Sequence, residues 1–115
     1  MRHGNTSEKE NTMNAFELTY EKQVNDYVDA LKYESDSRAF LEDFETDMRM
    51  GCYSDMTKQS NSQKMQLVLE NFIAQNPENW KKWKSLKNKY REATLQVQQY
   101  SALCDYYKTR LTTFG

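Results

Sequence analysis

The side chains best suited to bind a ligand lie in one stretch, NPENWKKWKSLKNKYR, residues 76–91. This stretch combines two Trp and one Tyr with a run of Lys and Arg. Rings can stack on exposed bases while cations contact phosphates, so the combination is typical of single-stranded nucleic-acid binding. In a heptad frame with Trp83 at position a, the residues left for such binding are Trp80, Lys81, Lys84 and Arg91.

The same stretch also has a structural interpretation, in which its aromatic side chains face a core. Trp83 and Tyr90 occupy core positions of the frame, and the flanking positions hold Lys82, Lys87 and Lys89. An antiparallel partner helix would place these lysines beside the acidic segment LEDFETDMRM, residues 41–50. We therefore expect carboxylates to match the lysines, and we expect a protein-binding face at Glu42, Asp43, Glu45 and Asp47.

The sequence holds no recognisable constellation for catalysis. His3 is the single histidine, so a His-rich metal site is excluded within one chain, and since it lies in a polar tail beside Gly4 with no orienting partner, we expect no Ser-His or Cys-His pair. The three glycines stand apart from one another, so no glycine-rich phosphate loop is formed. Asp43 and Asp47, one helical turn apart, are far more typical of a solvated acidic face than of a cation site. We expect no enzyme, no cofactor and no metal.

The two cysteines are expected to remain free thiols, because Cys52 lies in a connection and Cys104 lies well along the last helix. Cys104 is expected to be a small buried residue, and Cys52 to be exposed. Two free thiols, no hydrophobic leader and no apolar run long enough for a membrane span predict a cytoplasmic protein that does not use a membrane.

Charge divides the chain into two halves of opposite sign. Residues 1–57 hold six Lys/Arg and thirteen Asp/Glu, a balance of −7, and residues 58–115 hold ten and four, a balance of +6. The halves therefore either pair with each other or contact different partners. Only 37% of residues are hydrophobic, so a small core makes self-association an attractive source of further burial.

The elements that must position these groups are helices, because three Gly and one Pro leave few turn signals. A flexible tail is expected at 1–12 and a single helical domain at 13–115, with helices at about 13–50, 62–75 and 77–112. The segment ESDS, residues 34–37, could break the first helix, although a continuous helix is favoured. Gly51 is expected to end this helix in the left-handed conformation.

Both long helices carry a heptad seam, and the last one repeats without interruption. Its residues are Trp83, Leu86, Tyr90, Ala93, Val97, Tyr100, Cys104, Tyr107 and Leu111. The seam of the first helix is Met13, Phe16, Tyr20, Gln23, Tyr27, Ala30, Glu34, Ser37, Leu41, Phe44 and Met48. These patterns predict an all-α fold, an elongated antiparallel helical hairpin or three-helix bundle with seams like those of coiled coils.

The order of RMGCYSD, a short helix KMQLVLENFIAQ and a long helix beginning ENWKKW resembles phage recombination-mediator proteins. Those proteins are similar in having a helix, a tyrosine-containing turn and a C-terminal helical segment. The resemblance spans about 65 residues and implies single-stranded DNA binding. The chain departs from it by having an acidic first helix where that family carries many lysines.

Two functions are therefore expected. The first is a small non-catalytic interaction or assembly protein that self-associates, of the adaptor, structural or inhibitor type that phages and mobile elements encode. The alternative is a single-stranded nucleic-acid-binding accessory protein.

Overall fold

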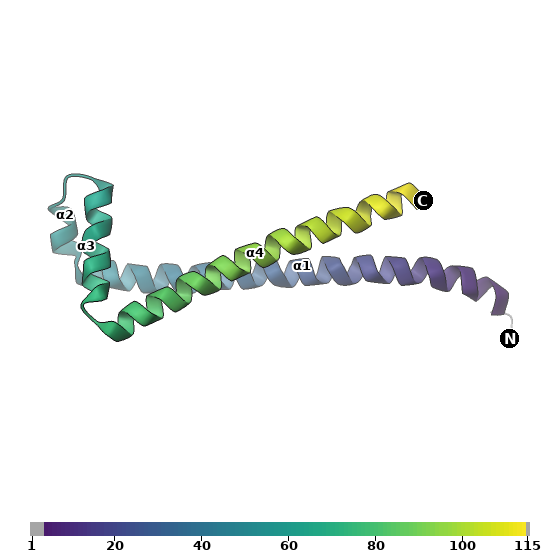
Figure 1. Cartoon of the computed structure of the whole chain (residues 1–115), viewed down its shortest axis with the longest axis horizontal. Helices are drawn as coiled ribbons and strands as arrows, with labels where there is room; N and C mark the ends of the chain where they lie inside the picture. Colours follow the sequence, from purple (N-terminus) through teal and green to yellow (C-terminus); the bar gives the residue numbers. More distant parts are fainter. Residues whose placement is uncertain (1–3, 115) are drawn as a thin grey trace. The chain divides into compact units, whose positions relative to one another are not determined.

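A computed structural model describes the backbone of residues 4–114 and the side chains of residues 15–113. Within this range the chain forms four helices and no strand (Figure 1). They are α1 (Gly4–Gly51), α2 (Tyr53–Thr57), α3 (Ser62–Ala74) and α4 (Pro77–Phe114). The predicted all-α fold, with one long helix packing against another as in a helical hairpin or bundle, is confirmed.

Three of the four helices lie where the sequence predicts them, with some changes at their ends. Helix α1 continues through residues 34–37 without a break, as favoured, but it already begins at Gly4. Helix α2 occupies part of the segment 52–61, which lies outside the three helices that the sequence predicts. His3 lies outside the described residues, as do the side chains of the predicted tail, so the flexibility of residues 1–12 stays a prediction.

Two asparagines define where α3 and α4 begin. The Asn61 side chain accepts a hydrogen bond from the Lys64 backbone N–H at 2.9 Å. The Asn76 side chain accepts from the backbone N–H groups of Glu78 at 2.9 Å and Asn79 at 3.3 Å. Each cap satisfies N–H groups that have no partner within the helix, and Pro77 then supplies a first helical residue that needs no such partner.

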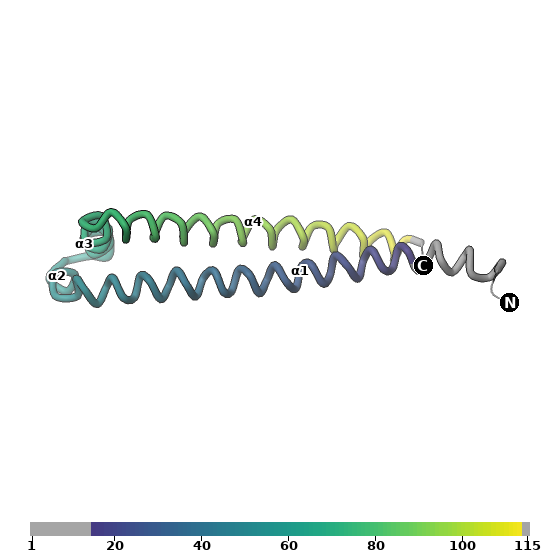
Figure 2. The backbone as a smooth tube through the Cα atoms, turned by 90° about the horizontal axis from the view of Figure 1, so that it is seen from below, coloured from purple at the N-terminus to yellow at the C-terminus, as the bar shows by residue number. Residues whose placement is uncertain are grey.

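The chain forms two compact units, and each long helix contributes a segment to both. The first unit combines residues 1–33 with 94–115, and the second comprises residues 34–93. In the second unit Arg38 contacts Tyr90 and Glu45 contacts Trp83, so a step of seven residues forward on α1 is a step of seven backward on α4. The two helices are therefore antiparallel there, as Figure 2 also shows.

The core of the second unit is a cluster in which α3 closes one end of the helix pair. Its buried members are Phe44, Cys52, Leu69, Ile73 and Trp83. Partly buried side chains pack around them: Leu41, Met48, Met56, Val68, Phe72, Trp80 and Leu86. Leu69 and Ile73 are fully buried, which explains why the short helix is held in place although it has only 13 residues.

The first unit has a narrower core made from the heptad seams alone. Ala30 is buried, and the other described seam residues of this unit are half-buried. Phe16 meets Tyr107 edge to face, with ring centroids 5.6 Å apart. The described seam positions in both units are buried or half-buried, which bears out the heptad assignment on both helices.

Gly51 does not have the predicted role of a left-handed cap. It is part of α1, and no glycine within the described residues has a positive φ. Its function is steric: a Cβ at this position would lie 2.6 Å from Cζ and 2.9 Å from Cε2 of the Phe72 ring. Glycine is required here because the ring of α3 packs directly on the backbone of α1.

Replacing Gly51 by Ala should therefore destabilise the protein despite the better helix propensity of Ala. That propensity favours the variant by about 1 kcal/mol, whereas overpacking costs about 1–3 kcal/mol. Urea unfolding followed by circular dichroism measures the difference. In a Phe72→Leu background, which removes the clashing ring atoms, G51A should become neutral or stabilising. Equal stabilisation by G51A in both backgrounds would contradict the steric role.

Candidate interaction surfaces

The cations of residues 81–91 lie on the surface of the second unit without carboxylate partners. Among the described residues, ion pairs join Arg38 to Glu34 and Lys58 to Asp55, and none includes a cation of this stretch. Lys82 instead lies over the Phe44 ring, 5.5 Å from its centroid, and Lys87 lies 4.0 Å from the Trp83 ring centroid. The expected matching of Lys82, Lys87 and Lys89 with acidic residues is therefore not formed.

Trp80 is less available than the sequence predicts. It is half-buried against the core cluster and meets Trp83 edge to face at 5.5 Å. The Lys84 ammonium lies 5.4 Å from the Trp80 ring centroid. A base stacking on that face of the ring would compete with Lys84. Of the predicted nucleic-acid-binding set, the residues that are exposed are Lys81, Lys84 and Arg91.

The predicted acidic face is divided between a structural residue and three exposed ones. Glu45 is half-buried, and its carboxylate accepts a hydrogen bond of 3.0 Å from the indole N–H of Trp83. This contact ties α1 to α4 in the core of the second unit. Glu42, Asp43 and Asp47 are exposed and remain available to a partner.

Exposed hydrophobic side chains extend the acidic face into a stripe along α1. Its residues follow one another at intervals of four, three, four and three, all exposed, and we call them the acidic stripe: Asp36, Phe40, Asp43, Asp47 and Met50. Phe40 is 64% and Met50 is 74% exposed, so two large apolar side chains face solvent next to carboxylates. Phe40 and Met50 were not among the predicted interface residues, because they lie outside the core seam, although they share its heptad spacing.

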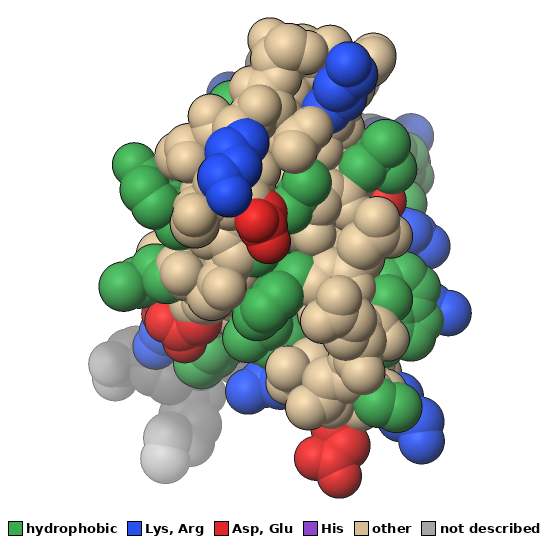
Figure 3. Space-filling model, turned by 90° about the vertical axis from the view of Figure 1, so that its left-hand side faces the viewer, with side chains coloured by type: hydrophobic (Ala, Val, Ile, Leu, Met, Phe, Trp, Pro, Cys, Tyr) green, Lys and Arg blue, Asp and Glu red, His purple; other side chains and the backbone are tan. Residues whose placement is uncertain are grey.

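A second stripe runs along α4 in the same unit. Its residues follow one another at intervals of three, four and three, all exposed, and we call them the basic stripe: Lys81, Lys84, Asn88 and Arg91. Viewed from the end of the molecule that carries α2 and α3, hydrophobic side chains lie among cations and carboxylates on the surface (Figure 3). Further exposed hydrophobic residues of this unit are Tyr53 and Leu67.

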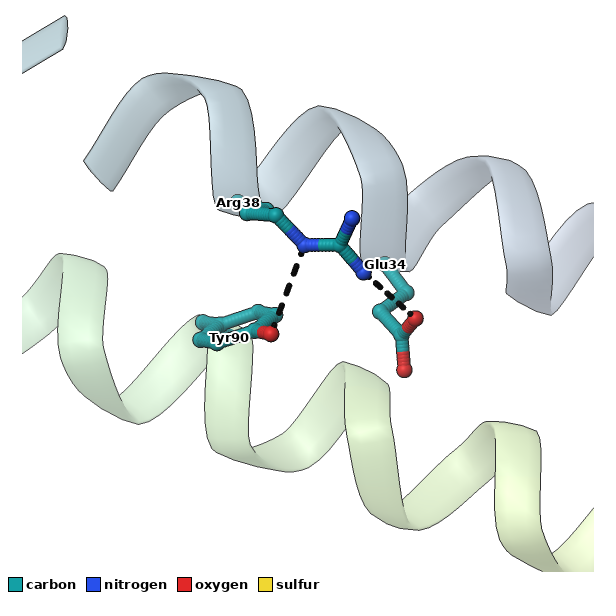
Figure 4. A network of polar contacts seen from close by, with 3 residues as sticks. All are labelled: Glu34, Arg38 and Tyr90. Atoms are coloured by element: carbon teal, nitrogen blue, oxygen red, sulfur yellow. Dashed lines mark hydrogen bonds and ion pairs between the residues drawn. The ribbon is translucent and has the colours of Figure 1, made fainter. Parts of the chain in front are cut away.

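The weakest part of the α1 seam, residues 34–37, is held by a polar contact (Figure 4). Arg38 donates to the Tyr90 hydroxyl at 3.4 Å and to the Glu34 carboxylate at 3.1 Å. The hydrogen bond to Tyr90 is the main cause that raises the pKa of Arg38 above the ordinary arginine value. Glu34 at a seam position is thus tolerated because its carboxylate has a charged partner one turn away.

The first unit contains a hollow of about 240 Å³. Its lining is Asp26, Asp29, Ala30, Tyr33, Gln96 and Tyr100. Two carboxylates and two phenol rings favour positive over negative charge in this place. In the described part of the chain, no three His, Cys, Asp or Glu side chains come together as a metal ion would require.

Both cysteines are free thiols, but their exposure differs from the prediction. Cys52 is buried in the core of the second unit and donates to the Met48 carbonyl at 3.4 Å, whereas Cys104 is half-buried. Burial raises the pKa of the Cys52 thiol, and the charge of Asp55 adds to the rise. Burial also raises the pKa of Cys104, with Asp105 and Asp26 contributing. Neither thiol has the lowered pKa of a reactive cysteine.

Among the described residues, no helix combines the length and apolarity needed to cross a bilayer. No protein-family model matches the chain, and no curated protein and no solved structure matches it either. The resemblance to phage recombination mediators therefore stays an expectation, and function has to be inferred from the surfaces of the chain itself.

The burial of the two thiols predicts the order in which they react. In the folded protein iodoacetamide should modify Cys104 faster than Cys52, because Cys52 becomes accessible only when the second unit opens. Both rates should rise with pH beyond the ordinary thiol value of about 8.5, since the raised pKa values keep the thiols neutral below it. Peptide mass spectrometry separates the two sites, and unfolding in urea should equalise them. Faster labelling of Cys52 in the folded state would contradict its burial.

Proposed function

We propose that the chain is a small non-catalytic protein–protein interaction or assembly protein that self-associates through the acidic stripe of α1. The observation that carries this proposal is the exposure of Phe40 and Met50 in line with Asp36, Asp43 and Asp47. Two free cysteines fit a reducing cytoplasm, which we include in the proposal.

The relative size of the interactions identifies Phe40 as the decisive residue. Burying a Phe side chain contributes about 1.5–3 kcal/mol, whereas an exposed ion pair contributes about 0–1 kcal/mol. The apolar side chains would therefore supply most of the affinity, and the three aspartates would select a basic partner surface and orient it. A solvated helix would gain nothing from two large apolar side chains at these positions.

Self-association should therefore depend on Phe40. Sedimentation velocity from micromolar to near-millimolar concentration should show wild-type oligomers that dissociate on dilution. Phe40→Glu should be monomeric over the same range, because it replaces apolar contact by a further charge among carboxylates. Ser35→Glu is the matched control, since it adds the same charge at an exposed position of α1 outside the acidic stripe and should associate like the wild type. A monomeric wild type, or an unaffected Phe40→Glu variant, would refute the proposal.

A second candidate, single-stranded nucleic-acid binding, is favoured by the cations of residues 81–91 that have no carboxylate partner. The exposed members of the predicted set are Lys81, Lys84 and Arg91, whereas Trp80 is half-buried and has the Lys84 ammonium over its ring. The acidic stripe on the same unit opposes this function by repelling phosphates.

Fluorescence anisotropy of a labelled single-stranded oligonucleotide tests this candidate. If the chain binds nucleic acid, affinity should be micromolar at low salt, fall steeply as salt is added, and disappear when Lys81, Lys84 and Arg91 are all replaced by Glu. Lys64→Glu in α3 is a control for a single charge reversal at an exposed position outside this set, and should bind like the wild type. Absence of binding at low salt would eliminate the candidate.

A further inference from the structure

We infer that the surface that covers the acidic stripe of one chain is the basic stripe of a second copy. This inference rests on the proposed self-association and adds the identity of the opposing surface. Each copy carries both stripes in its second unit. In a pair of copies, the acidic stripe of one can therefore contact the basic stripe of the other either in one direction or in both directions.

The two stripes have opposite charge, and between residues 15 and 113 neither takes part in an ion pair. The acidic stripe presents three aspartates, and the basic stripe presents two lysines and one arginine. No ion pair of the described residues involves any of these six groups. Contact between stripes of opposite sign is favourable, whereas two acidic or two basic stripes would repel each other, so charge selects the pairing.

The lengths of the stripes also agree. From Asp36 to Met50 the helix advances 14 residues, about 21 Å, and from Lys81 to Arg91 it advances 10 residues, about 15 Å, at about 1.5 Å per residue. The basic stripe therefore fits within the acidic one, and its three cations can each lie near a carboxylate.

The apolar members of the acidic stripe suit the long cationic side chains opposite them. Lysine and arginine stems cover apolar surface while their charged ends reach carboxylates, and an arginine can lie over a ring. The second unit already uses this contact four times, because Arg38, Lys82, Lys84 and Lys87 each lie over an aromatic ring of the same chain. Phe40 offers a fifth ring, and it is exposed.

A second copy satisfies both stripes at once, which a nucleic acid does not. A polynucleotide would neutralise Lys81, Lys84 and Arg91 but would leave Phe40 and Met50 in water beside carboxylates that repel it. A second chain buries the apolar residues and pairs both sets of charges.

Complementary charge reversal tests the inference in the full chain. One variant, Asp43→Lys/Asp47→Lys, makes the acidic stripe basic, and the other, Lys84→Glu/Arg91→Glu, makes the basic stripe acidic. All four positions are exposed, so both variants should fold, as circular dichroism can verify. In sedimentation velocity each variant alone should associate at least about tenfold more weakly than the wild type. An equimolar mixture should recover association, because every contact then joins opposite charges.

Matched controls carry the same change in charge at exposed positions outside the stripes. Glu17→Lys/Glu21→Lys and Lys64→Glu/Lys89→Glu should associate like the wild type. If the stripe variants associate as strongly as the wild type and mixing brings no gain, the inferred pairing is refuted. The proposed function still stands in that case, provided that Phe40→Glu remains monomeric. A wild type that is monomeric throughout refutes both the inferred pairing and the proposed self-association. If that monomer also binds a single-stranded oligonucleotide, the result supports nucleic-acid binding instead.

Discussion

The burial of Trp83 is the constraint on which the second unit depends. Its ring is 2% exposed and packs in the cluster with Phe44, Leu69 and Ile73, while its N–H is satisfied by Glu45 across the helix pair. A buried indole without that acceptor would lose a hydrogen bond to water and gain nothing in return. The contact between Trp83 and Glu45 thus fixes the register of α1 against α4. Trp83 and Phe44 together form the apolar surface that α3 covers.

This arrangement explains why Glu45 packs in the core of the second unit while the acidic residues near it on α1 are exposed. Glu45 and Asp47 are two residues apart on one helix, so they face different directions, one toward α4 and the other toward solvent. Lys82 and Lys87 lie over rings of the core, and among the described residues no cation of 81–91 forms an ion pair with a carboxylate of α1. The opposite charges of the two halves of the chain are therefore not consumed by folding.

Periodicity could be read from the sequence, whereas contacts between elements could not. The heptad seams on α1 and α4 were predictable because spacing along a helix is a local property, and the described seam positions are indeed buried or half-buried. The caps at Asn61 and Asn76 are equally local. The role of Gly51 depends on the position of the Phe72 ring on α3. The burial of Cys52 and the half-burial of Trp80 also depend on the packing of α3, so none of the three could be derived from residue spacing along one helix. Lysines over rings were missed because the lysines were assigned to carboxylates by charge alone.

The difference between helical spacing, which is local, and burial, which depends on neighbouring elements, also matters for function. A core seam excludes its side chains from water. The acidic stripe has the heptad spacing of a seam, but its apolar residues Phe40 and Met50 are exposed, and no other described residue covers them. Helix pairs bury one face of each helix, so any second apolar face has to be covered by something else or remain solvated. Phe40 and Met50 are large enough for that choice to matter, and the aspartates between them restrict the occupant to a basic surface. The basic stripe of α4 is such a surface. Since every copy of the chain carries both stripes, the basic stripe is always present at the same concentration as the acidic stripe.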